Sequence, residues 1–201
     1  MSNRASSAVS EQCAIILLDR GPKRIPFQFA PSSLRDGKGV DYTDIPIIGR
    51  SSPFKSYKMN PSRQISFTIN YHAHPEVETP FSIDQVKNTI NTLLSLPYPD
   101  YSSFVIKPPT KCLLVIGNLL KNFKCVCKHV SPSYRDDIPW DLDAVLPFGV
   151  SISLLFEECV NSPLSYSDIA NGQFADSSNA GDAENAAEIG YKNLPTSKTY
   201  S

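Results

Sequence analysis

The feature that most constrains the fold is a strict alternation of apolar and polar residues from position 64 to position 71. The apolar positions are Ile65, Phe67, Ile69 and Tyr71. Successive side chains of a strand point to opposite faces of a sheet, so the pattern predicts a strand with one buried face and one exposed face. The β-branched and aromatic residues favour a strand, and no Gly or Pro interrupts the run. A sheet that is covered on one face is typically antiparallel.

Other apolar runs predict the neighbours of this central strand. They lie at residues 13–18, 24–29, 102–107, 112–116, 122–130 and 149–159. The first run is apolar throughout and is expected to be buried on both faces, and the turn residues 19–22 join it to the second run as a hairpin. The inner face of the last strand is expected to carry Val150, Ile152, Leu154 and Phe156.

One amphipathic helix is predicted after the central strand. Ser82 with Gln85 three positions later forms a capping-box pattern, and Phe81 with Val86 fits a hydrophobic staple. The expected buried face consists of Val86, Ile90, Leu93 and Leu94. Pro97 disfavours helical geometry at the residue before it, so the helix should end there.

Composition limits the class of protein. The net charge of −1 gives no global electrostatic reason to bind nucleic acid or an acidic membrane. The five cysteines are odd in number and lack the spacing of a zinc knuckle, so we expect buried free thiols. Residues 1–12 lack the apolar core of a signal peptide, and the longest apolar run is too short to cross a bilayer. We therefore expect a soluble protein made in a cytoplasm, without membrane insertion.

The chain divides into three parts. Residues 1–12 are expected to be a flexible N-terminal arm, residues 13–159 one domain, and residues 160–201 an extended C-terminal tail. The tail carries five acidic and two basic side chains with scattered apolar residues, a composition that cannot support a core of its own. We predict that the tail is a docking strap for another subunit.

Within the domain, residues 30–62 are predicted to be a long loop with many Gly and Pro residues. Its apolar residues that look exposed are Val40, Tyr42, Ile45, Ile47, Ile48, Phe54 and Tyr57. A loop of this length in a compact domain is usually functional. Two interpretations remain open: a loop folded back on its own core, or an arm formed by residues 36–62 that contacts another subunit.

Two groups of residues invite a metal-site interpretation. The first is His72, His74, Glu76 and Glu78, but Pro75 interrupts the strand and a solvated loop is favoured. The second is Cys125, Cys127 and His129, which share one face of a predicted strand. Side chains two residues apart on a strand are separated by about 6.5–7 Å, too far for three to chelate one ion easily. Packed thiols are therefore expected.

Two further groups invite other chemistry. Glu157 and Glu158 are adjacent on a predicted strand, so they point to opposite faces and do not converge for acid–base catalysis. A basic set interleaved with Phe54 and Tyr57 suits a phosphate backbone or a polar subunit interface; it consists of Arg50, Lys55, Lys58 and Arg63. We expect no enzyme activity, cofactor or metal.

The segment Phe-Gln-Phe-Ala-Pro-Ser-Ser-Leu at residues 27–34 resembles the Phe-x-Phe-Asn-Pro-Ser-Ser-Leu segment of contractile-phage baseplate proteins. The similarity continues at residues 42–48, 49–53, 63–67, 86–101, 108–109, 112–117 and 140–142. Residues 13–159 are thus similar to the tube-like domain of contractile injection system baseplate proteins. Many of those relatives continue into a LysM module, whereas this chain ends in a polar tail.

The resemblance implies a mainly β (α+β) fold: a tail-tube-like split β-barrel of two packed antiparallel sheets with one flanking helix. It implies a structural virion protein of the tail baseplate, assembled in the host bacterial cytoplasm as a homo-hexameric ring. The ring would start the inner tube or link the central hub to the wedges, with hub, tube and wedge proteins as partners and no specific nucleic acid. The expected interface residues are Ile47, Ile48, Phe54, Tyr57, Trp140, Phe174, Tyr191 and Tyr200. The alternatives are a neck or tail-terminator connector, or an accessory protein that binds or hydrolyses peptidoglycan.

Overall fold

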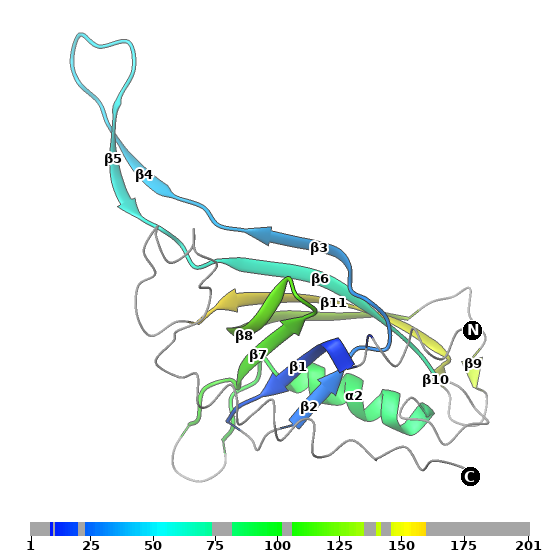
Figure 1. The fold of residues 1–201 in the computed structure, drawn as a ribbon. Coiled ribbons are helices and arrows are strands. Elements are labelled where there is room, and N and C mark those ends of the chain that lie inside the picture. Colours follow the sequence, from blue (N-terminus) through cyan, green and yellow to red (C-terminus); the bar gives the residue numbers. More distant parts are fainter. Residues whose placement is uncertain are drawn as a thin grey trace.

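The computed structural model describes residues 9, 11–19, 23–73, 82–101, 106–134, 140–141 and 146–159, and every structural statement below refers to these residues. The strands are β1 (Cys13–Leu17), β2 (Lys23–Pro26), β3 (Ser32–Gly37), β4 (Asp41–Ile45), β5 (Phe54–Met59), β6 (Gln64–His72), β7 (Lys111–Ile116), β8 (Leu120–Tyr134), β9 (Trp140–Asp141), β10 (Leu146–Pro147) and β11 (Gly149–Glu158). The described helix is α2 (Ile83–Ser95) (Figure 1). The expectation of a mainly β protein with antiparallel sheets and one helix is confirmed.

Seven of the strands form one antiparallel sheet in the order β2-β1-β7-β8-β11-β6-β3. The long strand β8 connects its two halves, because its first part pairs with β7 and its last part pairs with β11. The remaining strands form the separate pairs β4-β5 and β9-β10. Since β2 and β3 are edge strands of the large sheet, the described strands do not close into a barrel.

The central strand has the structure that its alternation predicts. In β6 the apolar residues are all buried and the polar residues between them are more exposed. Antiparallel pairing with β11 places Phe67 opposite Leu154 and Ile69 opposite Ile152. The rings of Phe67 and Phe156 stack with their centroids 5.8 Å apart. These pairs form the middle of the core.

Strand β1 is buried on both faces, as predicted, and forms a hairpin with β2. Cys13, Ile15 and Leu17 belong to the main core. Ile16, on the opposite face of the strand, forms a second cluster with Leu113 of β7. The fully apolar run therefore serves two apolar layers.

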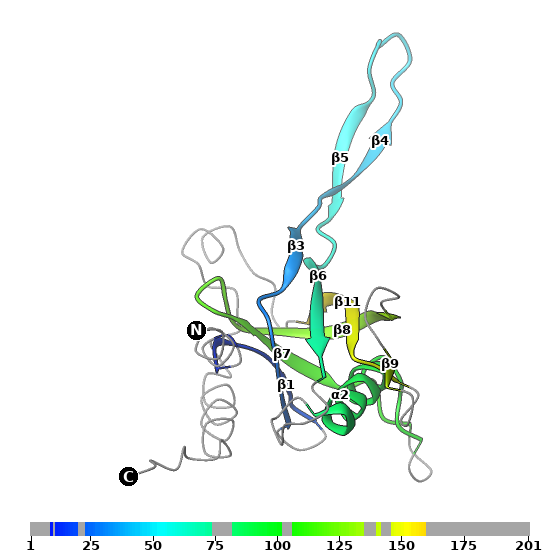
Figure 2. The same cartoon turned by 90° about the vertical axis from the view of Figure 1, so that its right-hand side faces the viewer.

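Helix α2 covers the core at the end of the molecule away from the β4-β5 pair (Figures 1 and 2). Val86, Ile90 and Leu93 are buried as predicted, whereas Leu94 is only partly buried. The helix ends at the predicted place, and Leu96 at its C-cap is also buried. The capping box is wrong: Ser82 occupies the N-cap, but its side chain makes no capping hydrogen bond. The staple residue Phe81 lies outside the described residues.

Strand β8 departs from the predicted alternation after Cys127. Phe123, Cys125 and Cys127 are buried, but His129 is exposed. The pairing with β11 shows why: Leu155 opposes His129 and Phe156 opposes Cys127, so Lys128 is an extra residue in a β-bulge. A bulge shifts the alternation by one residue, and His129 therefore turns away from the core.

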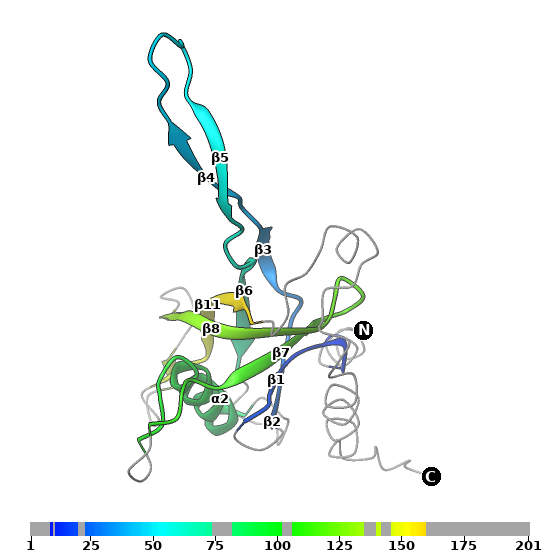
Figure 3. The ribbon, with the colours of Figure 1, turned by 90° about the vertical axis from the view of Figure 1, so that its left-hand side faces the viewer.

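The largest difference from the prediction concerns residues 30–62, which were expected to be a loop. They contain β3, β4 and β5. Strand β3 joins the edge of the sheet beside β6, and β4-β5 continues as a hairpin that projects far from the body (Figures 1, 2 and 3). We call residues 38–62 the hairpin arm. The alternative of a loop folded back on its own core is wrong, because the large apolar residues of this hairpin are exposed.

Several predictions fall partly or wholly outside the described residues. The expected strand 102–107 is described only at its end, where Lys107 forms an isolated bridge with Asp100. The N-terminal arm 1–12 is described only at residues 9, 11 and 12, and the tail 160–201 not at all. Among the described helices, none has the length and apolar character needed to span a membrane.

Candidate interaction surface

The hairpin arm is built by regular antiparallel pairing of β4 with β5. Tyr42 lies opposite Tyr57 and Asp44 opposite Lys55, while Ile45 lies opposite Phe54. Because side chains alternate along a strand, the first two pairs lie on one face of the ribbon and the third pair lies on the other. The arm therefore carries apolar side chains on both faces.

The tip of the arm is a tight turn over residues 47–50, closed by a hydrogen bond of 3.2 Å from the Arg50 N–H to the Ile47 carbonyl. Gly49 stands at the third position with φ +86°, a conformation that a β-turn of type II requires and that Gly adopts without steric cost. Ile48 at the second position is 105% exposed. A β-branched apolar residue in full contact with water at a turn is not explained by the folding of this chain.

Local contacts hold the two strands of the arm together without covering them. The rings of Tyr42 and Tyr57 meet edge to face with centroids 6.3 Å apart. The Lys55 Nζ atom lies 2.8 Å from the Asp44 Oδ1 atom, with both side chains more than half exposed. A two-stranded hairpin is marginally stable alone in water, and an exposed apolar surface of this kind marks an interaction site.

The structure brings four of the predicted interface residues together on the arm: Ile47, Ile48, Phe54 and Tyr57. Trp140 is also exposed, but it lies on β9 rather than on the arm. The remaining three, Phe174, Tyr191 and Tyr200, lie outside the described residues. Met59 also exposes its side chain on the arm and was missed, although its place two residues after Tyr57 in a short apolar-polar run could have indicated it.

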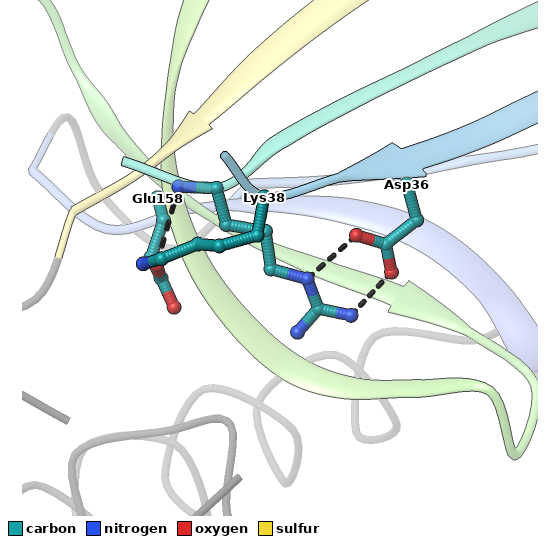
Figure 4. Close-up of polar contacts among 4 residues, drawn as sticks. Asp36, Lys38 and Glu158 are labelled. Carbon is teal, nitrogen blue, oxygen red and sulfur yellow. Dashed lines mark hydrogen bonds and ion pairs between the residues drawn. The ribbon is translucent and has the colours of Figure 1, made fainter. Parts of the chain in front are cut away.

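The base of the arm contains a network of four charged residues (Figure 4). The Lys38 Nζ atom donates to the Glu158 Oε2 atom at 3.1 Å. Arg63 donates through Nε to Asp36 Oδ1 at 2.6 Å, and its Nη2 donates to Asp36 Oδ2. The guanidinium carbon also lies 5.4 Å from the centroid of the Phe123 ring. The hydrogen bonds from Arg63 to Asp36 raise the pKa of Arg63, so the guanidinium remains charged.

The ion pairs also show how two groups of charged residues singled out in the sequence are arranged, namely the adjacent carboxylates and the basic set. Glu158 bonds to Lys38, whereas Glu157 pairs with Lys128 at 2.9 Å, so the two carboxylates do not converge, as expected. Of the basic set, Arg63 and Lys55 are each paired with an Asp side chain. Those two residues do not extend the exposed positive track that a phosphate backbone would need.

The thiols lie in the core rather than at a site. Burial raises the pKa of Cys112 to about 12 and that of Cys127 to about 11, and it raises the pKa of Cys125 well above the ordinary value. These three and Cys13 are free and buried, as expected, whereas Cys159 is free but only half-buried. Groups of three or more His, Cys, Asp or Glu side chains with the arrangement of a metal site do not occur among the described residues. His74, Glu76 and Glu78 of the first metal interpretation lie outside them.

No protein-family model matches the chain, and no curated protein is similar to it.

Proposed function

We propose that this protein is a structural subunit of a contractile-tail baseplate, where the hairpin arm contacts a neighbouring copy in a ring. The observation that carries the proposal is the arm itself. It projects from the body, exposes apolar residues on both faces, and ends in the fully exposed Ile48. The resemblance of residues 13–159 to tube-like baseplate domains supplies the setting, a homo-hexameric ring beside hub, tube and wedge proteins of a virion.

The proposal includes a tail-tube-like split barrel, and the role of β8 supports it. One strand pairs with β7 through its first part and with β11 through its last part. The bulge at Lys128 lies in the β8-β11 ladder, two residues after the last pair of β8 with β7, and bulges bend a strand and increase its twist. A sheet bent along one shared strand wraps its two halves around one core, which here contains residues of β1, β6, β7, β8 and β11.

The energetic reason for assembly is the removal of apolar surface from water. Full burial of a side chain such as Ile48 or Phe54 contributes about 1.5–3 kcal/mol. In a closed ring each copy both gives and receives an arm, so this contribution repeats at every interface. The arm is also expected to become more ordered on docking, because a neighbour then supplies the packing surface that an isolated two-stranded ribbon lacks.

The test compares two isoleucines that are both exposed. Ile48→Ser alters the arm tip, and Ile106→Ser alters an isoleucine outside the arm that is 67% exposed. Sedimentation velocity of the full chain is measured alone and with tail particles from its source. The wild type and the Ile106 variant should form oligomers or sediment with the particles, whereas the Ile48 variant should do neither. Melting temperatures of all three should agree.

Two outcomes would contradict the proposal. Assembly that survives combined substitution of Ile47, Ile48 and Phe54 by Ser would show that the arm is not the contact. Absence of the protein from purified tail particles, measured by mass spectrometry, would remove the baseplate setting. A density map of the particle would place the ring at the tube start, at the hub–wedge junction or at the neck.

A further inference from the structure

The hairpin arm meets the body through two short segments that lie outside the β3-β6 and β4-β5 ladders. The last pair of the β3-β6 ladder is Gly37 with Gln64, and the first pair of the arm is Asp41 with Met59. Residues 38–40 and 60–63 lie between these pairs and belong to neither ladder. Outside these two ladders, the direction of the arm depends on the few contacts that the two segments make with the body, and such a place can act as a hinge.

An ion pair links each of the two segments to the body. Lys38, in the first segment, bonds to Glu158 at the end of β11. Arg63, in the second segment, bonds through two guanidinium nitrogens to Asp36 of β3. Figure 4 shows Asp36, Lys38 and Glu158 near one another at the base of the arm. The bidentate geometry of the second pair fixes direction as well as distance.

The two segments are connected through the Glu158 carboxylate. The Glu158 Oε2 atom that accepts from Lys38 also accepts from the Arg63 backbone N–H at 3.4 Å. In return, the Glu158 N–H donates to the Arg63 carbonyl at 2.8 Å. Both segments of the hinge therefore converge on the end of the same strand.

Each of these pairs joins a largely buried side chain to a more exposed one, since Lys38 is 42% exposed and Asp36 is 36% exposed. The Glu158 side chain is 3% exposed and the Arg63 side chain 13% exposed. The Glu158 Oε1 atom is buried and accepts no hydrogen bond from the residues that the structure describes. A buried carboxylate that loses its cation is strongly disfavoured, so Glu158 holds Lys38 in place more firmly than an exposed pair would. The Lys55–Asp44 pair within the arm is exposed on both sides and provides the contrast.

The two segments also touch each other. A Cβ atom placed on Gly39 would lie 3.6 Å from the Cγ atom of Pro61, so the backbone of one segment lies beside the ring of the other. The fixed φ of Pro61 removes one degree of freedom from the longer segment. The hinge thus has little freedom while both ion pairs are made.

We propose that the Lys38–Glu158 and Arg63–Asp36 ion pairs fix the direction in which the hairpin arm leaves the sheet, and that Lys38, Arg63, Asp36 and Glu158 are positioning residues for docking. This inference rests on the proposed function, since it concerns the same arm. A ring closes only if every arm reaches its neighbour at one angle. If loss of the pairs spreads the arm over ten comparable directions, the competent fraction and the apparent affinity both fall by about tenfold.

The test measures arm direction in the unassembled full chain. Spin labels on non-natural amino acids at Ser51 near the arm tip and Lys87 on α2 give a distance distribution by double electron–electron resonance. The wild type should give one narrow distribution. Lys38→Met should broaden it, whereas Lys38→Arg, which keeps the positive charge beside Glu158, should leave it narrow. Lys55→Met, which breaks the exposed pair, should leave it unchanged.

Glu158→Gln provides a second variant that keeps the shape of the side chain, in case Lys38→Met lowers the melting temperature. A narrow distribution in both variants would overturn the inference. A broad distribution combined with wild-type assembly would also overturn it, because arm direction would then not limit docking. Failure of the wild type to assemble, with a narrow distribution that Lys38→Met broadens, would count against the proposed function and leave the hinge assignment in place.

Discussion

The packing of α2 gives the sharpest stability prediction, because two adjacent leucines lie in different environments. Leu93 is 0% exposed and belongs to the main core, whereas Leu94 is only partly buried beside it. The change is Leu→Ala at each position in turn. Both substitutions remove the same atoms and alter helix propensity equally, so the difference between them reports burial alone.

The expected magnitude follows from the environment of each side chain. Truncating a fully buried leucine typically costs about 2–5 kcal/mol, because the transfer free energy of the lost atoms is joined by the cost of the cavity. Leu93 belongs to the main core, and α2 contacts β8, which is paired with β7 on one side and with β11 on the other. The site therefore has little room to collapse, and we expect a value in the upper half of that range. Leu94 keeps contact with water and should cost less than about half as much.

The assay is urea unfolding of the full chain followed by circular dichroism. A shift of the midpoint with an unchanged slope identifies a stability change rather than a change in the surface exposed on unfolding. In a chain of 201 residues, each 1 kcal/mol corresponds to a change of about 2–4 °C in melting temperature. Equal losses for the two variants would refute the assigned helix orientation, and a larger loss for Leu94 would mean that the helix is rotated on its axis.

Three further predictions concern other parts of the molecule. Burial raises the pKa of Cys112 to about 12 and of Cys127 to about 11 in the folded protein. As pH rises above about 9, the unfolded state loses these protons first, so the free energy of unfolding should fall. A free energy of unfolding that stays constant between about pH 9 and about pH 11 would contradict the burial of these thiols. Tyr71→Phe removes a hydrogen bond of 3.0 Å to a backbone carbonyl at the end of β2 and should lower the free energy of unfolding by about 1 kcal/mol in urea titration, whereas no change would show that this bond is replaced by water. Removal of residues 160–201 should leave the melting temperature of the domain intact and stop assembly; unfolding of the truncated chain would place the tail in the core instead.

Much of the core was predictable because its signals are local and periodic. The alternation of β6 and β11, the uniform burial of β1 and the apolar face of α2 each follow from the spacing of side chains along one element. The separation of Glu157 from Glu158 follows from the same period. These features needed no knowledge of which element lies beside which.

The sequence by itself determined which faces of the core strands and of the helix are buried, because the spacing of apolar residues along one element shows which side chains share a face. Only the tertiary structure decided what depends on partners far away in the chain. The exposure of His129 follows from a bulge that exists only in the pairing of β8 with β11. Residues 30–62 contain Gly and Pro residues that locally indicate a loop, and they become strands because β6 and the two sides of the arm supply their ladders. The arm owes its direction to Glu158, which is 120 residues from Lys38 in sequence and 3.1 Å from it in space.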